Sequence, residues 1–157
     1  LPVAPSPNLP TARAVYLYAA LCPFEGTVVS LGRGTDKPFE MYGHPDMTER
    51  AFTFTPRPTA GAKHPPLEGR LCRGVDLSGM PLAEARDVGF SLKYVMDACA
   101  DLGMGDKFFT PMFEKLVGVE WVREMILAGA PEEEIRARWA DDVERYREKR
   151  VQYLLYE

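Results

Sequence analysis

The chain has 157 residues, 46% of them hydrophobic and 27% charged, and a net charge of −4. This composition is typical of one globular domain with a substantial core, and no apolar stretch approaches the length of a membrane span. Residues 1–80 carry 8 basic and 7 acidic groups, and residues 81–157 carry 11 and 16. Because neither half is a basic surface, we expect no nucleic-acid partner.

The first half is rich in proline and glycine. Twelve of the fourteen prolines fall in the first 81 residues, which argues against long helices there. Residues 1–10 form an extended, proline-rich opening, and a short helix follows, with Thr11 as its N-cap and its end before Pro23. Strands are predicted over residues 27–31, 51–55 and 71–77.

The second half is predicted to be helical. An apolar stripe from Leu82 to Gly103 indicates one helix, and further helices run from Thr110-Pro111 to Gly118, from Trp121 to Gly129, and from Pro131 onward. Glu132–Glu134 would form the solvated first turn of that last helix, where the helix dipole favours negative charge. Residues 151–156 are too apolar for a loose tail, so we expect them to pack on the body.

These elements predict an α+β fold: a β-rich first half packed with a helical second half, as a single compact domain over residues 1–157. The chain begins Leu1-Pro2-Val3, with neither an initiator methionine nor a signal peptide. We therefore expect it to be a piece of a longer protein.

Metal chemistry is not indicated. His44 and His64 each precede a proline and are predicted to be surface turn residues, since a zinc site would need three or four closely spaced ligands. Cys22, Cys72 and Cys99 are too scattered for a disulfide framework or a metal knuckle. Either one disulfide forms, most readily Cys22–Cys72, or all three thiols are reduced. We expect no metal and no cofactor.

The turn Gly32-Arg33-Gly34-Thr35 is the sharpest local feature. Its glycines permit positive φ and leave backbone N–H groups uncovered, and arginine offers a planar fork that suits a carboxylate or phosphate. The turn is therefore a candidate anion clamp. The alternative is a tight turn whose arginine only pairs with Glu25 or Asp36.

Glu25 precedes Gly26-Thr27, at the start of the predicted strand 27–31. A partly desolvated carboxylate there could act as a general acid or base, or it could hold a substrate hydroxyl. A structural salt bridge or a turn cap is the alternative. Aromatic residues in the first half could offer a surface to a sugar ring or belong to the core: Tyr16, Tyr18, Tyr42, Phe52 and Phe54. These patterns alone name no function.

Several segments together resemble one family. They are "PSPNLPT" at 5–11, "LCPFEGTVVSLGRGTDKPFE" at 21–40, "GRLCRGVDL" at 69–77, and the C-terminal "FFTPMFEKLVG…EEEIRARW…YREKRVQYLLY". In this order they resemble the C-terminal domain of NamZ-type exo-β-N-acetylmuramidases, long catalogued as a domain of unknown function. The resemblance implies a Rossmann-like domain upstream, absent here, as a partner within the same polypeptide.

The resemblance also implies an activity: release of N-acetylmuramic acid from the non-reducing end of peptidoglycan fragments. On this view Arg33 binds the lactyl carboxylate that distinguishes muramic acid from N-acetylglucosamine. Glu25 would be the catalytic acid/base or a hydroxyl ligand, and Gly32, Gly34, Thr27 and Thr35 would complete the substrate-binding set. The substrate implies a periplasmic or extracellular location, with a cytoplasmic role as the alternative.

Two departures from the family pattern bear on the substrate. Val28 stands where asparagine is typical, and Gly43-His44-Pro45-Asp46 replaces a typical G-A-P-W. Glycoside hydrolysis ordinarily needs two carboxyl groups, whose separation decides between retention and inversion. Glu25 is the one suitable carboxylate here, so the second is expected from the upstream domain. The rival hypotheses are a non-catalytic domain that binds peptidoglycan fragments and an anion-binding regulatory domain that binds phosphate.

Overall fold

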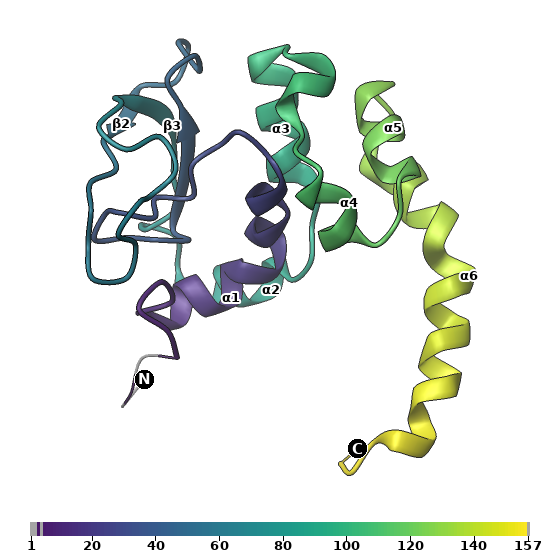
Figure 1. Cartoon of the computed structure of the whole chain (residues 1–157). Coiled ribbons are helices and arrows are strands. Elements are labelled where there is room, and N and C mark those ends of the chain that lie inside the picture. Colours follow the sequence, from purple (N-terminus) through teal and green to yellow (C-terminus); the bar gives the residue numbers. More distant parts are fainter. Residues whose placement is uncertain (1–2, 4, 157) are drawn as a thin grey trace.

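Three short strands of the first half form one antiparallel sheet, and the helices lie to one side of it (Figure 1). The computed structural model describes residue 3 and residues 5–156. The elements run in the order α1 (Ala12–Leu21), η1 (Cys22–Gly26), β1 (Met41–His44), β2 (Phe52–Phe54), β3 (Cys72–Asp76), α2 (Leu82–Val88), α3 (Lys93–Leu102), η2 (Gly105–Phe108), α4 (Met112–Val117), α5 (Trp121–Leu127), α6 (Glu132–Arg150) and η3 (Val151–Tyr153), where η denotes a 3₁₀ helix. The predicted α+β class and single domain are confirmed.

The strand order is β1-β3-β2. Strands β2 and β3 confirm the predictions over residues 51–55 and 71–77, whereas β1 was not predicted. The strand predicted over residues 27–31 is wrong. Val28 donates its N–H to the Phe108 carbonyl and Ser30 donates to the Gly43 carbonyl, so this segment pairs with two separate parts of the chain. It therefore makes isolated bridges instead of a ladder.

Helix α1 begins as predicted. Thr11 is extended and its Oγ1 accepts a hydrogen bond from the Ala14 N–H at 3.0 Å, which makes it the N-cap. The helix ends at Leu21, and Pro23 follows within η1. Of the predicted extended opening, residues 1, 2 and 4 lie outside the described residues, and Ser6 forms a turn by accepting a hydrogen bond from the Leu9 N–H.

The single helix predicted between Leu82 and Gly103 is wrong, because two helices occupy this stretch. Gly89, at φ +57°, ends α2 before α3 begins at Lys93. The Glu132 carboxylate accepts hydrogen bonds from the Leu92 N–H at 3.1 Å and the Ser91 hydroxyl at 3.0 Å. Glu132 is thus a cap for α3 and not the solvated residue that the sequence predicted.

The next two helices end where their glycines predict. Gly118 follows α4 at φ +80° and Gly129 follows α5 at φ +74°, both in conformations that glycine adopts readily. Helix α4 begins one residue later than predicted, at Met112, and Pro111 is its N-cap residue.

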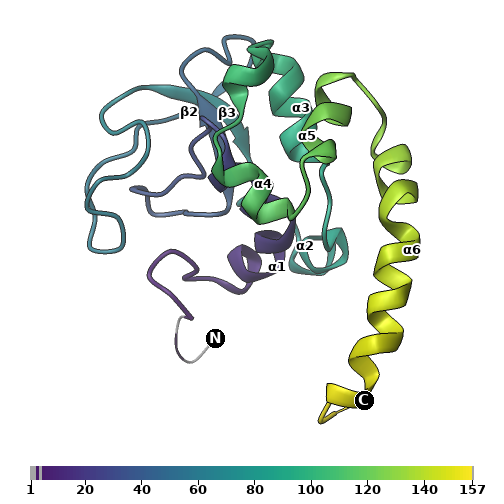
Figure 2. The same cartoon turned by 45° about the vertical axis from the view of Figure 1, so that its right-hand side comes forward.

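Helix α6 runs away from the body, and both views show its far end standing apart (Figures 1 and 2). Along its predicted apolar stripe Ile135 is fully buried, but Val143 is 40% and Tyr146 64% exposed. The prediction that residues 151–156 pack on the body is wrong, since all six are exposed. Because α6 leads away from the body, it places these residues far from the core.

The main core lies between one face of the sheet and the helices. Its largest fully buried side chains include Leu17, Phe24, Tyr42, Phe108 and Phe113. A small second cluster, made of Met41, Phe54 and Cys72, packs separately. All three cysteines are free thiols, so the disulfide alternative is wrong.

Two searches over the described residues bear on the function. No helix there combines the length and the apolar character needed to cross a membrane. Within the same residues, His, Cys, Asp and Glu side chains do not gather into a group that could hold a metal ion.

Candidate functional site

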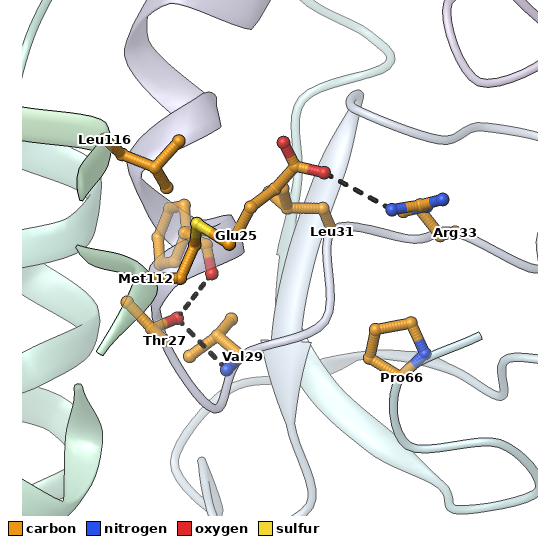
Figure 3. Close-up of a pocket in the computed structure, with 9 residues that line it drawn as sticks. Glu25, Thr27, Val29, Leu31, Arg33, Pro66, Met112 and Leu116 are labelled. Atoms are coloured by element: carbon orange, nitrogen blue, oxygen red, sulfur yellow. Dashed lines mark hydrogen bonds and ion pairs between the residues drawn. The ribbon is translucent and has the colours of Figure 1, made fainter. Parts of the chain in front are cut away.

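Glu25 and Arg33 come together at the surface. Glu25 sits in η1, and Arg33 sits in the glycine turn that follows. Arg33 Nη1 lies 3.3 Å from Glu25 Oε1, with the two side chains 36% and 31% exposed (Figure 3). The pairing of Arg33 with Glu25 is therefore present, as the simpler of the two sequence interpretations predicts.

Hydrogen bonds between its own residues stabilise the turn that carries Arg33. Thr35 donates its N–H to the Gly32 carbonyl at 3.0 Å and its hydroxyl to the same oxygen at 2.6 Å. Gly32 and Gly34 have φ +69° and +85°, and a Cβ on Gly34 would lie 2.6 Å from the Arg57 carbonyl oxygen. These three predicted binding residues shape the turn, and none of them lines the recess described next.

A recess of about 280 Å³ opens beside the ion pair. Glu25 and Arg33 lie at its polar side, and Figure 3 shows the residues around it. Its other lining residues are mainly apolar: Phe24, Thr27, Val29, Leu31, Pro66, Met112 and Leu116. The site thus combines one ion pair with an apolar surface.

Sequence reasoning missed several of these residues. Met112 and Leu116 reach the recess from α4, and Pro66 reaches it from the loop before β3. Both α4 residues are spaced by four and are 46% and 41% exposed, so they share one helix face that is not part of the core. The spacing of Met112 and Leu116 can be read from the sequence. That they line the same recess as Glu25 depends on tertiary packing.

Thr27 lines the recess, but its hydroxyl is engaged. It donates to the Phe24 carbonyl at 2.9 Å and accepts from the Val29 N–H at 3.2 Å (Figure 3). Val28, the first departure from the family pattern, packs against the main core and is not among the lining residues. In this chain, the change from asparagine therefore lies outside the lining of the recess.

Arg33 carries one unusual group. Its Nε is buried and has no hydrogen-bond partner within the described part of the chain. Leaving such a group unpaired costs about 1–3 kcal/mol, whereas an exposed ion pair contributes only about 0–1 kcal/mol. The pairing with Glu25 does not offset this cost. A carboxylate bound to the Nε–Nη2 edge of the guanidinium would satisfy Nε, but the Arg33 side chain must first shift, because Nε has almost no accessible surface in this conformation.

The second departure and the thiols lie elsewhere. His44 ends β1 with 6% exposure, and its Nδ1 accepts a hydrogen bond from the Asp46 N–H at 3.2 Å, so its prediction as a surface turn residue is wrong. His64 is exposed, as predicted. Burial raises the pKa of the Cys72 thiol to about 11, which disfavours the thiolate.

Comparison with known proteins decides the family. Residues 16–156 match the family described as "Exo-beta-N-acetylmuramidase NamZ, C-terminal". The chain belongs to this family. The NamZ resemblance noted in the sequence is thereby confirmed, and it covers both Glu25 and Arg33.

Two longer proteins are similar to this NamZ C-terminal chain. The peptidoglycan β-N-acetylmuramidase NamZ of Bacillus subtilis (strain 168) is 35% identical, over 98% of this chain and 40% of that protein. The crystal structure of a DUF1343 family protein from Bacteroides fragilis is 54% identical, with a TM-score of 0.94 over 100% of this chain and 44% of the other. The chain therefore spans less than half the length of either relative.

Proposed function

We propose that this chain binds N-acetylmuramic acid at the end of peptidoglycan fragments, as one side of the sugar-binding cleft of an exo-β-N-acetylmuramidase. The observation that carries the proposal is the buried, unpartnered Nε of Arg33 beside an apolar recess. Family membership and the B. subtilis relative support the substrate class. Catalysis would need the rest of a longer protein.

The chemistry of the sugar suits the recess. Muramic acid differs from N-acetylglucosamine by a lactyl ether, which adds a carboxylate and a methyl group. The carboxylate would bind Arg33 through two parallel hydrogen bonds. The lactyl and acetamido methyl groups would contact the apolar side, where Leu31, Met112 and Leu116 lie.

Glu25 would serve the sugar as a hydrogen-bond acceptor or as the catalytic acid/base. It is the one carboxylate among the described residues that line this recess. Since glycoside hydrolysis ordinarily uses two carboxyl groups, the second would come from outside this chain. This same observation favours a second candidate function, a domain that binds peptidoglycan fragments without hydrolysing them.

A titration tests the proposal. We would add N-acetylmuramic acid, its lactyl methyl ester and N-acetylglucosamine to the isotopically labelled chain and follow the amide and Arg33 Nε–H signals by NMR. The proposal predicts that the free acid shifts Arg33 Nε–H, Glu25 and the glycine turn, and that the two neutral sugars do not. Inorganic phosphate serves as a control anion.

Three outcomes would count against the proposal. Equal responses to the acid and its ester would show that Arg33 does not bind the lactyl carboxylate. Competition by phosphate, with no response to any sugar, would favour the regulatory anion-binding domain. A lack of response to all ligands would mean that this chain alone does not hold the site. Turnover of a muramic acid glycoside by the longer protein would separate the hydrolase from the non-catalytic binder, and its fractionation would test the periplasmic location.

A further inference from the structure

A second recess lies against the same ion pair. It has a volume of about 210 Å³ and is lined by Ser6, Asn8, Leu9, Tyr18, Glu25, Arg33 and Phe39. Glu25 and Arg33 thus line both recesses. Each is smaller than the roughly 300 Å³ at which pockets for drug-sized ligands begin, so each recess suits a smaller group, such as one sugar ring.

The second recess is aromatic where the first is aliphatic. The rings of Tyr18 and Phe39 lie with centroids 5.3 Å apart at an angle of 45°. Tyr18 is 39% exposed, so part of its ring is open to solvent, whereas Phe39 is 3% exposed and supports it from behind. Ser6 and Asn8 lie beside the rings, where Ser6 Oγ accepts a hydrogen bond from the Asn8 N–H at 3.2 Å and the Asn8 amide nitrogen donates to the Gly61 carbonyl at 3.0 Å. A ligand would therefore use the Ser6 O–H and the Asn8 amide oxygen.

The backbone at Phe39 is held in a conformation that costs free energy. Its φ is +59°, which is an outlier for a bulky residue. The Phe39 N–H donates a hydrogen bond to the Leu31 carbonyl at 2.9 Å, which anchors Phe39 to the segment that carries Arg33. Such strain persists where the surroundings over-determine it, and it clusters at ligand sites.

Tyr18 is also coupled to the ion pair electrostatically. Burial raises the pKa of its phenol, and the negative charge of the nearby Glu25 carboxylate raises it further. The phenol therefore stays neutral at physiological pH and can donate a hydrogen bond. A neutral donor on an exposed ring suits the hydroxyl-bearing edge and apolar face of a sugar.

We propose that the Tyr18–Phe39 recess binds a second sugar ring, adjacent to the muramic acid bound at Arg33, and that the Tyr18 ring is its platform. This inference rests on the proposed function, since it takes the first ring to be held by Arg33. It makes the ligand of this chain a disaccharide that spans the Glu25–Arg33 pair.

The test compares affinities for N-acetylmuramic acid and for its β-1,4-linked disaccharide with N-acetylglucosamine. Tyr18→Ala is expected to weaken binding of the disaccharide about tenfold and to change binding of the monosaccharide less than about twofold. Tyr18→Phe keeps the ring and loses only the hydroxyl, so it is expected to weaken binding of the disaccharide clearly less than Tyr18→Ala does. Tyr16→Ala is the matched control, because Tyr16 lies on the same helix with the same 39% exposure and lines neither recess.

The outcomes separate this inference from the proposed function. Loss of both ligands in Arg33→Ala, with the selective loss in Tyr18→Ala, would support both. If Arg33→Ala loses both ligands but Tyr18→Ala behaves like Tyr16→Ala, the second subsite is wrong and the proposed function stands. The subsite is also wrong if the disaccharide binds no more tightly than the monosaccharide. If Arg33→Ala binds both sugars as the wild type does, or if the wild type binds neither, both proposals fail.

Discussion

The Arg33 guanidinium pairs with Glu25 through one nitrogen and leaves a second nitrogen without a partner. Nη1 lies 3.3 Å from Glu25 Oε1, while Nε is buried and unpaired within the described residues. Buried donors of native proteins usually have a partner, so this unsatisfied Nε asks for an explanation. The proposed function supplies one: Glu25 would orient the arginine, and a ligand carboxylate would complete its hydrogen bonds.

The turn that positions Arg33 should not tolerate a side chain at Gly34. An added Cβ would lie 2.6 Å from both the Arg57 carbonyl oxygen and Pro65 Cγ. Gly69 has a similar φ of +72° with nothing within 4 Å of its added Cβ, so it is the matched control. We expect Gly69→Ala to cost about 1 kcal/mol of unfolding free energy and Gly34→Ala about 1–3 kcal/mol more, as measured by urea denaturation. Equal costs would show that the clash is relieved.

A buried carboxylate ties α1 to the sheet. Glu40, whose side chain is 3% exposed, accepts hydrogen bonds from the Thr11 hydroxyl and from Arg13 Nη1, the latter at 3.0 Å. Glu40→Ala would leave Arg13 half-buried without this partner, and we expect a loss of about 2–4 kcal/mol. Asp142→Ala, at an exposed ion pair with Arg145, is the control and should cost less than about 1 kcal/mol. A small loss in Glu40→Ala would mean that water replaces the carboxylate.

Acid should destabilise the fold partly through His44. Burial lowers its pKa below the ordinary value of 6.5, and Arg70 adds to this effect while Asp46 opposes it. The unfolded state therefore takes up a proton at a higher pH than the folded state, so the stability present above pH 6.5 falls as the pH drops below it. Between pH 7.5 and 5, His44→Gln should lose less unfolding free energy than the wild type, whereas His64→Gln should lose as much. The same pH dependence in all three proteins would contradict this assignment.

Short sequence motifs predicted much of the helical half correctly. The errors in the β-rich half arose where the structure depends on contacts between distant segments. Gly118 and Gly129 end their helices as the sequence predicts, because a glycine stop acts within one turn. The strand predicted over residues 27–31 failed because its partners, Phe109 and Gly43, come from separate parts of the chain. Strand β1 was missed because all four of its residues are buried, which removes the alternation that marks a strand.

The candidate site follows the same division. Glu25 and Arg33 are eight residues apart, so the sequence could place them together. The recess beside them also needs Pro66 and the exposed face of α4, which no local pattern connects to the glycine turn. The apolar tail after α6 misled the prediction because hydrophobicity alone does not say whether a surface is covered.

The affinity of Arg33 variants for the two sugars tests the central claim most directly. Calorimetric titration of the wild type, Arg33→Lys and Arg33→Ala with N-acetylmuramic acid and N-acetylglucosamine would give each preference as a ratio. A charged bidentate contact contributes about 1.5–3 kcal/mol, so the wild type should prefer muramic acid by at least about tenfold. That ratio should fall to about one in Arg33→Ala and lie between in Arg33→Lys, which keeps the charge without the planar fork. An unchanged preference in Arg33→Ala would contradict the account.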